Sequence, residues 1–125
     1  MDIHRGDIFF MYPDKTDHFI GSEQSGPRPV VIIQNDRGNK YSDTTIIANI
    51  STKDKNTLPT HVRLHNKYIA FPSVAMLEQI RTISKERLGK YIGSLSSSQM
   101  KKIDKAICIS LGIDRRSFNN GNKSK

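Results

Sequence analysis

The sequence predicts an α+β domain that is mainly β, with several short strands and one helix near the C-terminus. Three observations indicate this fold class. Short apolar runs rich in β-branched residues are separated by Gly, Pro, Asn and Asp, as in small β proteins. One segment near the C-terminus has apolar residues at helical spacing. The length of 125 residues suits a single hydrophobic core.

The expected strands are short and differ in burial. Residues 30–33 are all Val or Ile and predict a strand buried on both faces. Polar Glu78, Gln79 and Arg81 interrupt another apolar strand, which indicates a functional site nearby. The alternative is that they lie on the solvent face of the sheet, and alternation favours this for Arg81. Between the strands, Asn35 to Asn39 has turn composition. The full set of expected strands is residues 8–11, 30–33, 44–50, 61–64 and 73–83.

A helix is expected over Ser97–Leu111. Ser96 and Gln99 occupy the positions of a capping box, and Gly112 is a stop signal. The apolar stripe of this helix predicts packing on the core and no cofactor contact. Its members are Met100, Ile103, Ile107 and Leu111.

Residues 1–113 are expected to form one domain, and residues 114–125 a disordered basic tail that lacks any apolar pattern. The chain has a formal charge of +8 and a pI near 9.8. This charge favours a polyanionic partner, either nucleic acid or an acidic protein segment, although a solvated basic surface explains it equally well. Because no membrane segment or signal peptide is visible, we expect a cytoplasmic protein.

Metal and nucleotide chemistry are not predicted. The four histidines lack the spacing and carboxylate grouping of a zinc site, and a single cysteine, Cys108, excludes an internal disulfide. No glycine is followed by the Gly-Lys-Ser/Thr of a phosphate-binding loop. We therefore expect no metal and no cofactor, and assign any phosphoryl chemistry to side chains.

The segment Gly21–Val30 is the strongest candidate for a site. It is a polar loop that ends with Arg28, held between Pro27 and Pro29, at the entrance to a buried strand. The two prolines restrict the backbone, and a guanidinium can fork onto two phosphate oxygens. The residues alone leave open whether Arg28 is catalytic or simply solvated.

Ordered motifs along the chain resemble those of the MazF/PemK toxins. They extend over about residues 3–113, and each is weak alone while the ordered set is specific. The motifs are Arg5-Gly6-Asp7, Gly21-Ser22-Glu23-Gln24, Arg28-Pro29-Val30-Val31, Gln34-Asn35-Asp36, Gly38-Asn39, Pro59-Thr60-His61-Val62, Leu77-Glu78-Gln79-Ile80-Arg81-Thr82 and Ile109-Ser110-Leu111-Gly112.

The resemblance implies a small SH3-like barrel with a C-terminal helix, assembled as a homodimer. It implies a toxin of a type II toxin-antitoxin system that cleaves single-stranded RNA without a metal, leaving 2',3'-cyclic phosphate and 5'-OH ends. A small acidic antitoxin would be its protein partner. The alternative is a noncatalytic basic module on the same fold, which binds nucleic acid or poisons a protein target.

The resemblance also implies catalytic roles. Arg28 matches the essential arginine of the family. Ser51 falls on the second catalytic position, which is usually threonine, and retains the hydroxyl while losing the methyl that restricts χ1. Glu23 is a candidate base, or else an ion-pair partner that orients Arg28, and we weigh the two equally.

The expected RNA contacts are polar residues in or beside these motifs. Gln79 and Asn35 can read base edges, and Gln24 belongs to the same loop as Glu23. His61 is a further possible contact, although a strand histidine beside Thr60 is more often structural. Phe9 and Phe10 could stack on a base if exposed, but we expect both in the core.

Overall fold

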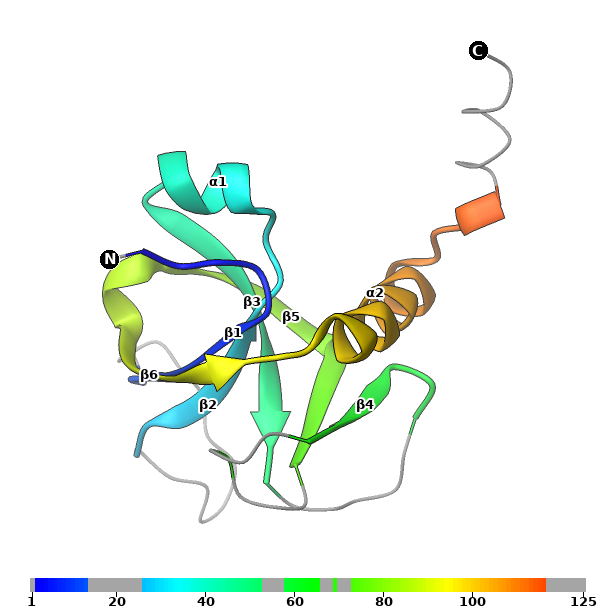
Figure 1. The fold of residues 1–125 in the computed structure, drawn as a ribbon, viewed down its shortest axis with the longest axis horizontal. Helices are drawn as coiled ribbons and strands as arrows, with labels where there is room; N and C mark the ends of the chain where they lie inside the picture. The colour runs from blue at the N-terminus through cyan, green and yellow to red at the C-terminus, as the bar shows by residue number, and fades with distance from the viewer. Residues whose placement is uncertain (1, 14–25, 53–57, 66–68, 70–72, 117–125) are drawn as a thin grey trace.

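A computed structural model of the chain describes residues 2–13, 26–52, 58–65, 69 and 73–116. These residues form a six-stranded antiparallel sheet with a longer helix on one face and a short helix at one end (Figure 1). The strands are β1 (Asp7–Met11), β2 (Arg28–Ile32), β3 (Thr44–Ser51), β4 (His61–Leu64), β5 (Ser73–Ser84) and β6 (Leu88–Ser94). The helices are α1 (Asp36–Tyr41), the 3-10 turn η1 (Lys85–Arg87) and α2 (Ser97–Leu111).

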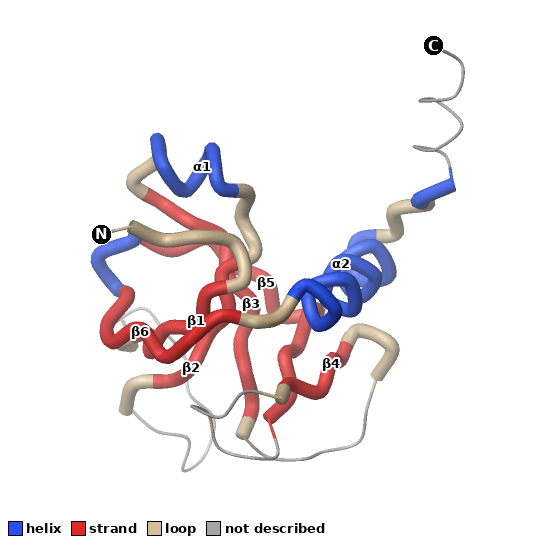
Figure 2. Tube along the Cα trace, in the orientation of Figure 1, coloured by secondary structure: helices blue, strands red, loops and turns tan. Residues whose placement is uncertain are grey.

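The strand order in the sheet is β4-β5-β3-β2-β1-β6, and every neighbouring pair is antiparallel. The sheet curls, as the tube in Figure 2 shows, but β4 and β6 remain separate edges within the described residues. The predicted mainly β fold with a C-terminal helix is therefore confirmed, as a barrel-like sheet that is not closed.

Each face of the sheet carries its own hydrophobic cluster. The first cluster lies against α2 and contains Val31 of β2, Val62 of β4 and Ile103 of α2. The second lies on the opposite face and contains Val30 and Ile32 of β2. Because successive side chains of a strand point to opposite faces, β2 contributes to both clusters, as its β-branched sequence predicts.

Local sequence signals set both ends of α2. The Ser96 side chain accepts a hydrogen bond from the Gln99 N–H (3.2 Å), and the Gln99 side chain accepts one from the Ser96 N–H (3.4 Å), which completes the predicted capping box. Gly112 ends the helix with a left-handed φ of 70°, a conformation that costs glycine little.

The prediction that the apolar stripe of α2 packs on the core is wrong for one of its members. Ile103 is fully buried, and Met100 and Ile107 pack against the core, but Leu111 is 59% exposed. The last turn of α2 projects past the sheet (Figure 1), so no described strand lies beneath this part of the stripe. Ala106, which was not predicted, is buried instead.

The predicted turn at Asn35 to Asn39 is wrong, because these residues begin α1. Asn35 is its N-cap and accepts a hydrogen bond from the Gly38 N–H at 2.7 Å. Asn39 is buried, and its side-chain oxygen accepts hydrogen bonds from Thr45 Oγ1 (2.7 Å) and Gln34 Nε2 (3.1 Å). Its side-chain nitrogen donates to the Gln34 carbonyl at 2.9 Å, so both groups of this buried amide are bonded, which stabilises a helix too short to form alone.

Within the described residues, no helix is long and apolar enough to cross a lipid bilayer. Of the tail predicted to be disordered, residues 117–125 lie outside the described part of the chain. The prediction for the tail therefore stays a prediction.

Candidate active site

The register of the sheet brings Arg28 and Ser51 to the same end of neighbouring strands. β2 and β3 pair with Val30 opposite Asn49. The pairing ends there, and Arg28 and Ser51 each lie two residues beyond this last pair, at the same end of the two strands; the register continued to that point sets them opposite each other. Directly opposed residues project from the same face, with Cβ atoms about 4.5–5.5 Å apart. Two residues that the resemblance implies to be catalytic thus become neighbours.

Arg28 is the first residue of β2, as expected for an arginine at a strand entrance. It is half-buried, and its Nε atom is shielded from solvent. Met11 of β1 stands opposite it on the other side. Strand pairing therefore limits the movement of its backbone, and the side chain projects from a fixed position.

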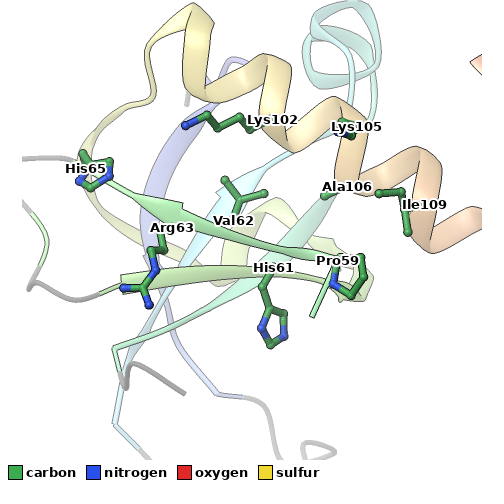
Figure 3. A pocket seen from close by; sticks show the side chains of 9 residues that line it. All are labelled: Pro59, His61, Val62, Arg63, His65, Lys102, Lys105, Ala106 and Ile109. Carbon is green, nitrogen blue, oxygen red and sulfur yellow. The ribbon is translucent and has the colours of Figure 1, made fainter. Parts of the chain in front are cut away.

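The same face continues across β3, β5 and β4. Asn49 precedes Ser51 by two residues and projects to the same side. His61 pairs with Met76, which pairs with Asn49, and in the next row Arg63 pairs with Val74, which pairs with Ser51. In Figure 3, His61 and Arg63 point to the same side of β4, whereas Val62 points toward α2.

We call this set of side chains the polar face. It lies on the side of the sheet away from α2, and three of its members are basic or can become cationic. Its members are Arg28, Asn49, Ser51, His61 and Arg63. The Glu78 carboxylate lies against one of these members, His61.

A bulge in β5 adds further polar groups beside the polar face. The β3–β5 register passes from Ala48↔Ile80 to Asn49↔Met76, which leaves residues 77–79 as extra residues on β5. Bulges re-aim side chains and are frequent next to functional sites. Here the bulge brings the Gln79 side chain within hydrogen-bond distance of Asn49, with Asn49 Nδ2 donating to Gln79 Oε1 at 3.0 Å.

Glu78, in the same bulge, is bonded to the start of β4. Thr60 Oγ1 donates to Glu78 Oε1 and His61 Nε2 lies against Glu78 Oε2, each at 2.8 Å. Burial acts to raise the pKa of Glu78, but the hydrogen bonds from His61, its own backbone N–H and Thr60 outweigh it, so the pKa lies below its ordinary value. Glu78 is thus a stable anion that ties the bulge to β4.

The hydrogen bonds of His61 identify its tautomer. The Leu58 N–H donates to His61 Nδ1 at 3.2 Å, so this nitrogen carries no proton. Nε2 then carries the proton and donates it to Glu78. Both ring nitrogens are engaged within the protein, which favours a positioning role for His61 over direct contact with RNA.

The other predicted site residues are not all at this face. Asn35 caps α1 at the far end of β2 from Arg28, so the structure does not place it with the others (Figure 1). Glu23 and Gln24 lie outside the described residues. Their predicted roles therefore stay predictions.

Three residues of the site were not assigned a role from the sequence: Asn49, Arg63 and Glu78. Asn49 carried a signal, because it is the one polar residue in the run Ile46–Ile50. Glu78 carried a similar signal, because it is a charged residue inside an apolar strand. Its partners Thr60 and His61 could not be predicted from the sequence. Arg63 carried none, since a charge on an alternating strand is ordinary.

One motif of the resemblance proves to be structural. Arg5 bonds to the Ile33 carbonyl (2.9 Å) and to Asp104 of α2 (2.6 Å). Asp7 is buried and accepts a hydrogen bond from Ser94 of β6 at 2.6 Å. Gly6 has a φ of 94°, and a side chain there would approach Met100 Sδ to 3.2 Å. This motif joins the N-terminal segment to α2 and β6.

A groove of about 500 Å³ lies between β4 and α2 (Figure 3). Its lining includes basic residues of both elements and the apolar Ile109, and none of the lining residues is acidic. His61 and Arg63 also line the groove, although their side chains point away from α2, to the side of the polar face (Figure 3). The basic lining residues are His61, Arg63, His65, Lys102 and Lys105.

Residues 4–111 match the family of PemK-like, MazF-like toxins of type II toxin-antitoxin systems. This match extends over most of the chain, and the protein belongs to that family. The family assignment made from the ordered motifs is therefore confirmed.

Solved structures of MazF-type proteins have the same fold. An endoribonuclease from a Mycobacterial species, in complex with its cognate antitoxin, is 23% identical with a TM-score of 0.74, and the match covers 90% of this chain and 97% of that one. The Mycobacterium tuberculosis toxin MazF-mt6 is 26% identical with a TM-score of 0.65, covering 86% and 98%. MazF from Deinococcus radiodurans is 16% identical with a TM-score of 0.71, covering 90% and 98%.

Proposed function

We propose that this toxin is an endoribonuclease that cleaves single-stranded RNA at specific sequences, without a metal ion or other cofactor, in the cytoplasm. The observation that carries the proposal is that Arg28 and Ser51 lie at the same end of neighbouring strands, two residues beyond the last β2–β3 pair, on a face with further basic groups. Membership of a toxin family and the endoribonucleases among its structural neighbours support it. A guanidinium and a hydroxyl side by side can bind the oxygens of one phosphate.

In the proposed reaction, RNA supplies its own nucleophile. The 2'-oxygen attacks the adjacent phosphorus, the bond from phosphorus to the 5'-oxygen breaks, and a 2',3'-cyclic phosphate and a 5'-OH result. Arg28 stabilises the negative charge that develops on the phosphoryl oxygens, and Ser51 donates a hydrogen bond to one of these oxygens or to the leaving oxygen. The proton lost by the 2'-OH passes to a base, and another proton reaches the leaving oxygen.

Glu23 remains our candidate for the base, beside the equal alternative that it orients Arg28. Glu78 is a poor candidate, because its carboxylate already accepts hydrogen bonds from Thr60 and His61 and its pKa is lowered. A good base at neutral pH has a raised pKa. Glu78 instead positions the groups around it.

The test is cleavage of a long RNA in excess chelator, with mapping of the cut ends. We expect discrete cuts by the wild type and a roughly hundred- to thousandfold lower rate for Arg28→Ala, the usual cost of losing a transition-state donor. Arg28→Lys should not restore the rate, because an ammonium cannot make the forked contact. The unfolding free energy should fall by about 1 kcal/mol or less, since the side chain is only half-buried.

A substrate with one 2'-deoxy nucleotide at the cut position supplies the matched control, because it removes the nucleophile and leaves the protein unchanged. It should bind and stay intact. Cutting of the deoxy substrate, or near-normal cutting by Arg28→Ala, would contradict this mechanism. Intact RNA that still binds the wild-type protein would identify the noncatalytic alternative.

We further propose that an acidic antitoxin segment lies in the groove between β4 and α2. The basic lining and absence of acidic lining residues suit a negatively charged chain. A segment there would reach His61 and Arg63 at the rim of the polar face and obstruct RNA. The Mycobacterial endoribonuclease of the same fold is in complex with its cognate antitoxin, which supports an antitoxin as the partner.

Charge reversal tests this partner site. Lys102→Glu with Lys105→Glu should leave RNA cleavage largely intact and raise by at least roughly tenfold the concentration of antitoxin needed for inhibition. The antitoxin used would be the product of the small open reading frame next to the toxin gene. Lys90→Glu, an exposed position on β6 outside the groove, is the control. If the antitoxin inhibits the wild type, the double variant and Lys90→Glu equally, it binds outside the groove between β4 and α2.

We also propose that the toxin is a homodimer, as the resemblance implies. Light scattering of the purified protein should give twice the mass of the 14.2 kDa chain. A mass equal to one chain across the working concentration range would contradict it.

A further inference from the structure

The hydrogen bond between Asn49 and Gln79 leaves a donor and an acceptor side by side. Asn49 uses an N–H of its amide and Gln79 uses its carbonyl oxygen. Each amide has the other group still available, which is Oδ1 of Asn49 as an acceptor and Nε2 of Gln79 as a donor. Neither of these atoms makes a hydrogen bond to another of the described residues.

This amide pair lies next to the proposed catalytic groups. Asn49 and Ser51 are two residues apart on one strand, which is about 6.6–6.8 Å, and project to the same face. That separation is comparable to the step between neighbouring nucleotides in an extended strand. When the phosphate to be cut lies at Arg28 and Ser51, the base of an adjacent nucleotide can reach the pair.

The surroundings hold the pair in position. Asn49 is half-buried within the paired part of β3, while Gln79 is exposed on the bulge of β5. The neighbouring Glu78 is bonded to both Thr60 and His61. These bonds limit the movement of the bulge, so the Gln79 amide meets an incoming base with little loss of entropy.

We propose that Asn49 and Gln79 together read the edge of one RNA base near the cut, with Asn49 as a specificity-determining residue. The inference rests on the proposed function. It adds which residues determine part of the preference for a cleavage sequence. Asn49 Oδ1 accepts from a base N–H, and Gln79 Nε2 donates to the neighbouring ring nitrogen or carbonyl oxygen. Uncharged amides with fixed donor and acceptor positions suit base edges better than phosphates.

Mapping of cut sites over a long RNA tests the proposal. The variants Asn49→Ala and Gln79→Ala should both relax one and the same position of the recognition sequence, lowering discrimination there by roughly ten- to a hundredfold. The other positions should keep their preference. Thr82→Ala, an exposed residue on the same strand as Gln79, is the control and should cut at the wild-type sites.

Asn49→Asp tests the polarity of the pair at nearly constant side-chain size. Aspartate has no N–H, so the Gln79 amide turns to donate to it and exposes its oxygen instead. The pair then offers two acceptors, which suit the two adjacent N–H groups of guanine. We expect the relaxed position to shift toward guanine in Asn49→Asp and to accept several bases in Asn49→Ala.

Binding measurements cover the case in which a variant no longer cuts. Arg28→Ala and Arg28→Ala with Asn49→Ala are compared on short RNAs that carry each of the four bases at each position of the sequence. Equal discrimination by the two proteins, or unchanged cut sites in a folded Asn49→Ala variant, would overturn the proposal while the nuclease function stands. Absence of cutting by the wild type would instead refute the proposed function and this inference with it.

Discussion

Around Asn49 and His61, the two faces of strands β3, β5 and β4 have opposite characters. Toward α2, the row Ile50, Ala75 and Val62 is buried in the first hydrophobic cluster. On the other side, the next residues along the same strands bear an amide and an imidazole, Asn49 and His61. One set of strands thus supplies both the core and the candidate site.

This comparison explains how so small a domain can hold a stable site. A strand packed by α2 on one face is held in position, and the side chains on its other face are therefore held as well. Sites on strands are more precise than sites on loops for this reason. Changes on the α2 side should alter stability, and changes on the polar side should alter RNA cleavage or its specificity.

The largest expected effect on stability is on the α2 side. Ile103→Ala removes a fully buried side chain from the first cluster and should lower the unfolding free energy by about 2–5 kcal/mol. Denaturant unfolding measures this effect. At a low temperature at which the Ile103→Ala variant is folded, it should cut RNA at close to the wild-type rate.

Lys101→Ala is the control, because this neighbouring residue of α2 is exposed, and its effect should stay within about 0.5 kcal/mol. Loss of cleavage by folded Ile103→Ala would show that the two faces are more strongly coupled than the alternation of side chains suggests.

The next effect concerns Ser51 on the polar side. Ser51→Ala should lower the cleavage rate by roughly ten- to a hundredfold, the cost of one hydrogen bond to a charged group, and change stability little. Ser51→Thr should retain or raise the rate, since its methyl restricts χ1 while the hydroxyl stays. Single-turnover kinetics on a short RNA measure both.

The adjacent Thr52 offers the matched control for Ser51. It is exposed and lies just beyond the end of β3, and Thr52→Ala should cut normally. If Ser51→Ala cuts RNA normally and Thr52→Ala cuts it slowly, the catalytic hydroxyl belongs to Thr52 and not to Ser51.

The smallest expected effect comes from Glu78. Its pKa is lowered in the folded protein, so its contribution to stability is present above the pKa of the unfolded chain, about 4.3, and is lost as the pH falls through the lower folded pKa. Because the side chain is 34% exposed, the contribution should be about 1 kcal/mol or less.

Glu78→Gln measures this contribution. Urea unfolding should show the variant less stable than wild type near neutral pH, with the difference shrinking once the pH falls below the folded pKa of Glu78. A difference that grows toward acid would mean that the carboxylate destabilises the folded protein.

The sequence predicts most strands because their signals are local. The β-branched run of β2, the alternating His61–Leu64 and the capped α2 each contain enough information within a few residues. The errors arise where long-range contacts dominate. α1 depends on the burial of Asn39 against Thr45, and Leu111 is exposed at the end of α2 that projects past the described strands (Figure 1).

For the candidate site, the sequence by itself determined which groups exist and which backbone presents them. Arg28 lies at a strand entrance between two prolines, and Ser51 ends a β-branched strand. The tertiary structure decided which of them meet. Strand register brings Arg28 and Ser51 to the same end of neighbouring strands, and the bulge in β5 sets Gln79 against Asn49 and Glu78 against His61. Register is set by pairing between distant segments, and a shift of one residue would turn each side chain to the other face.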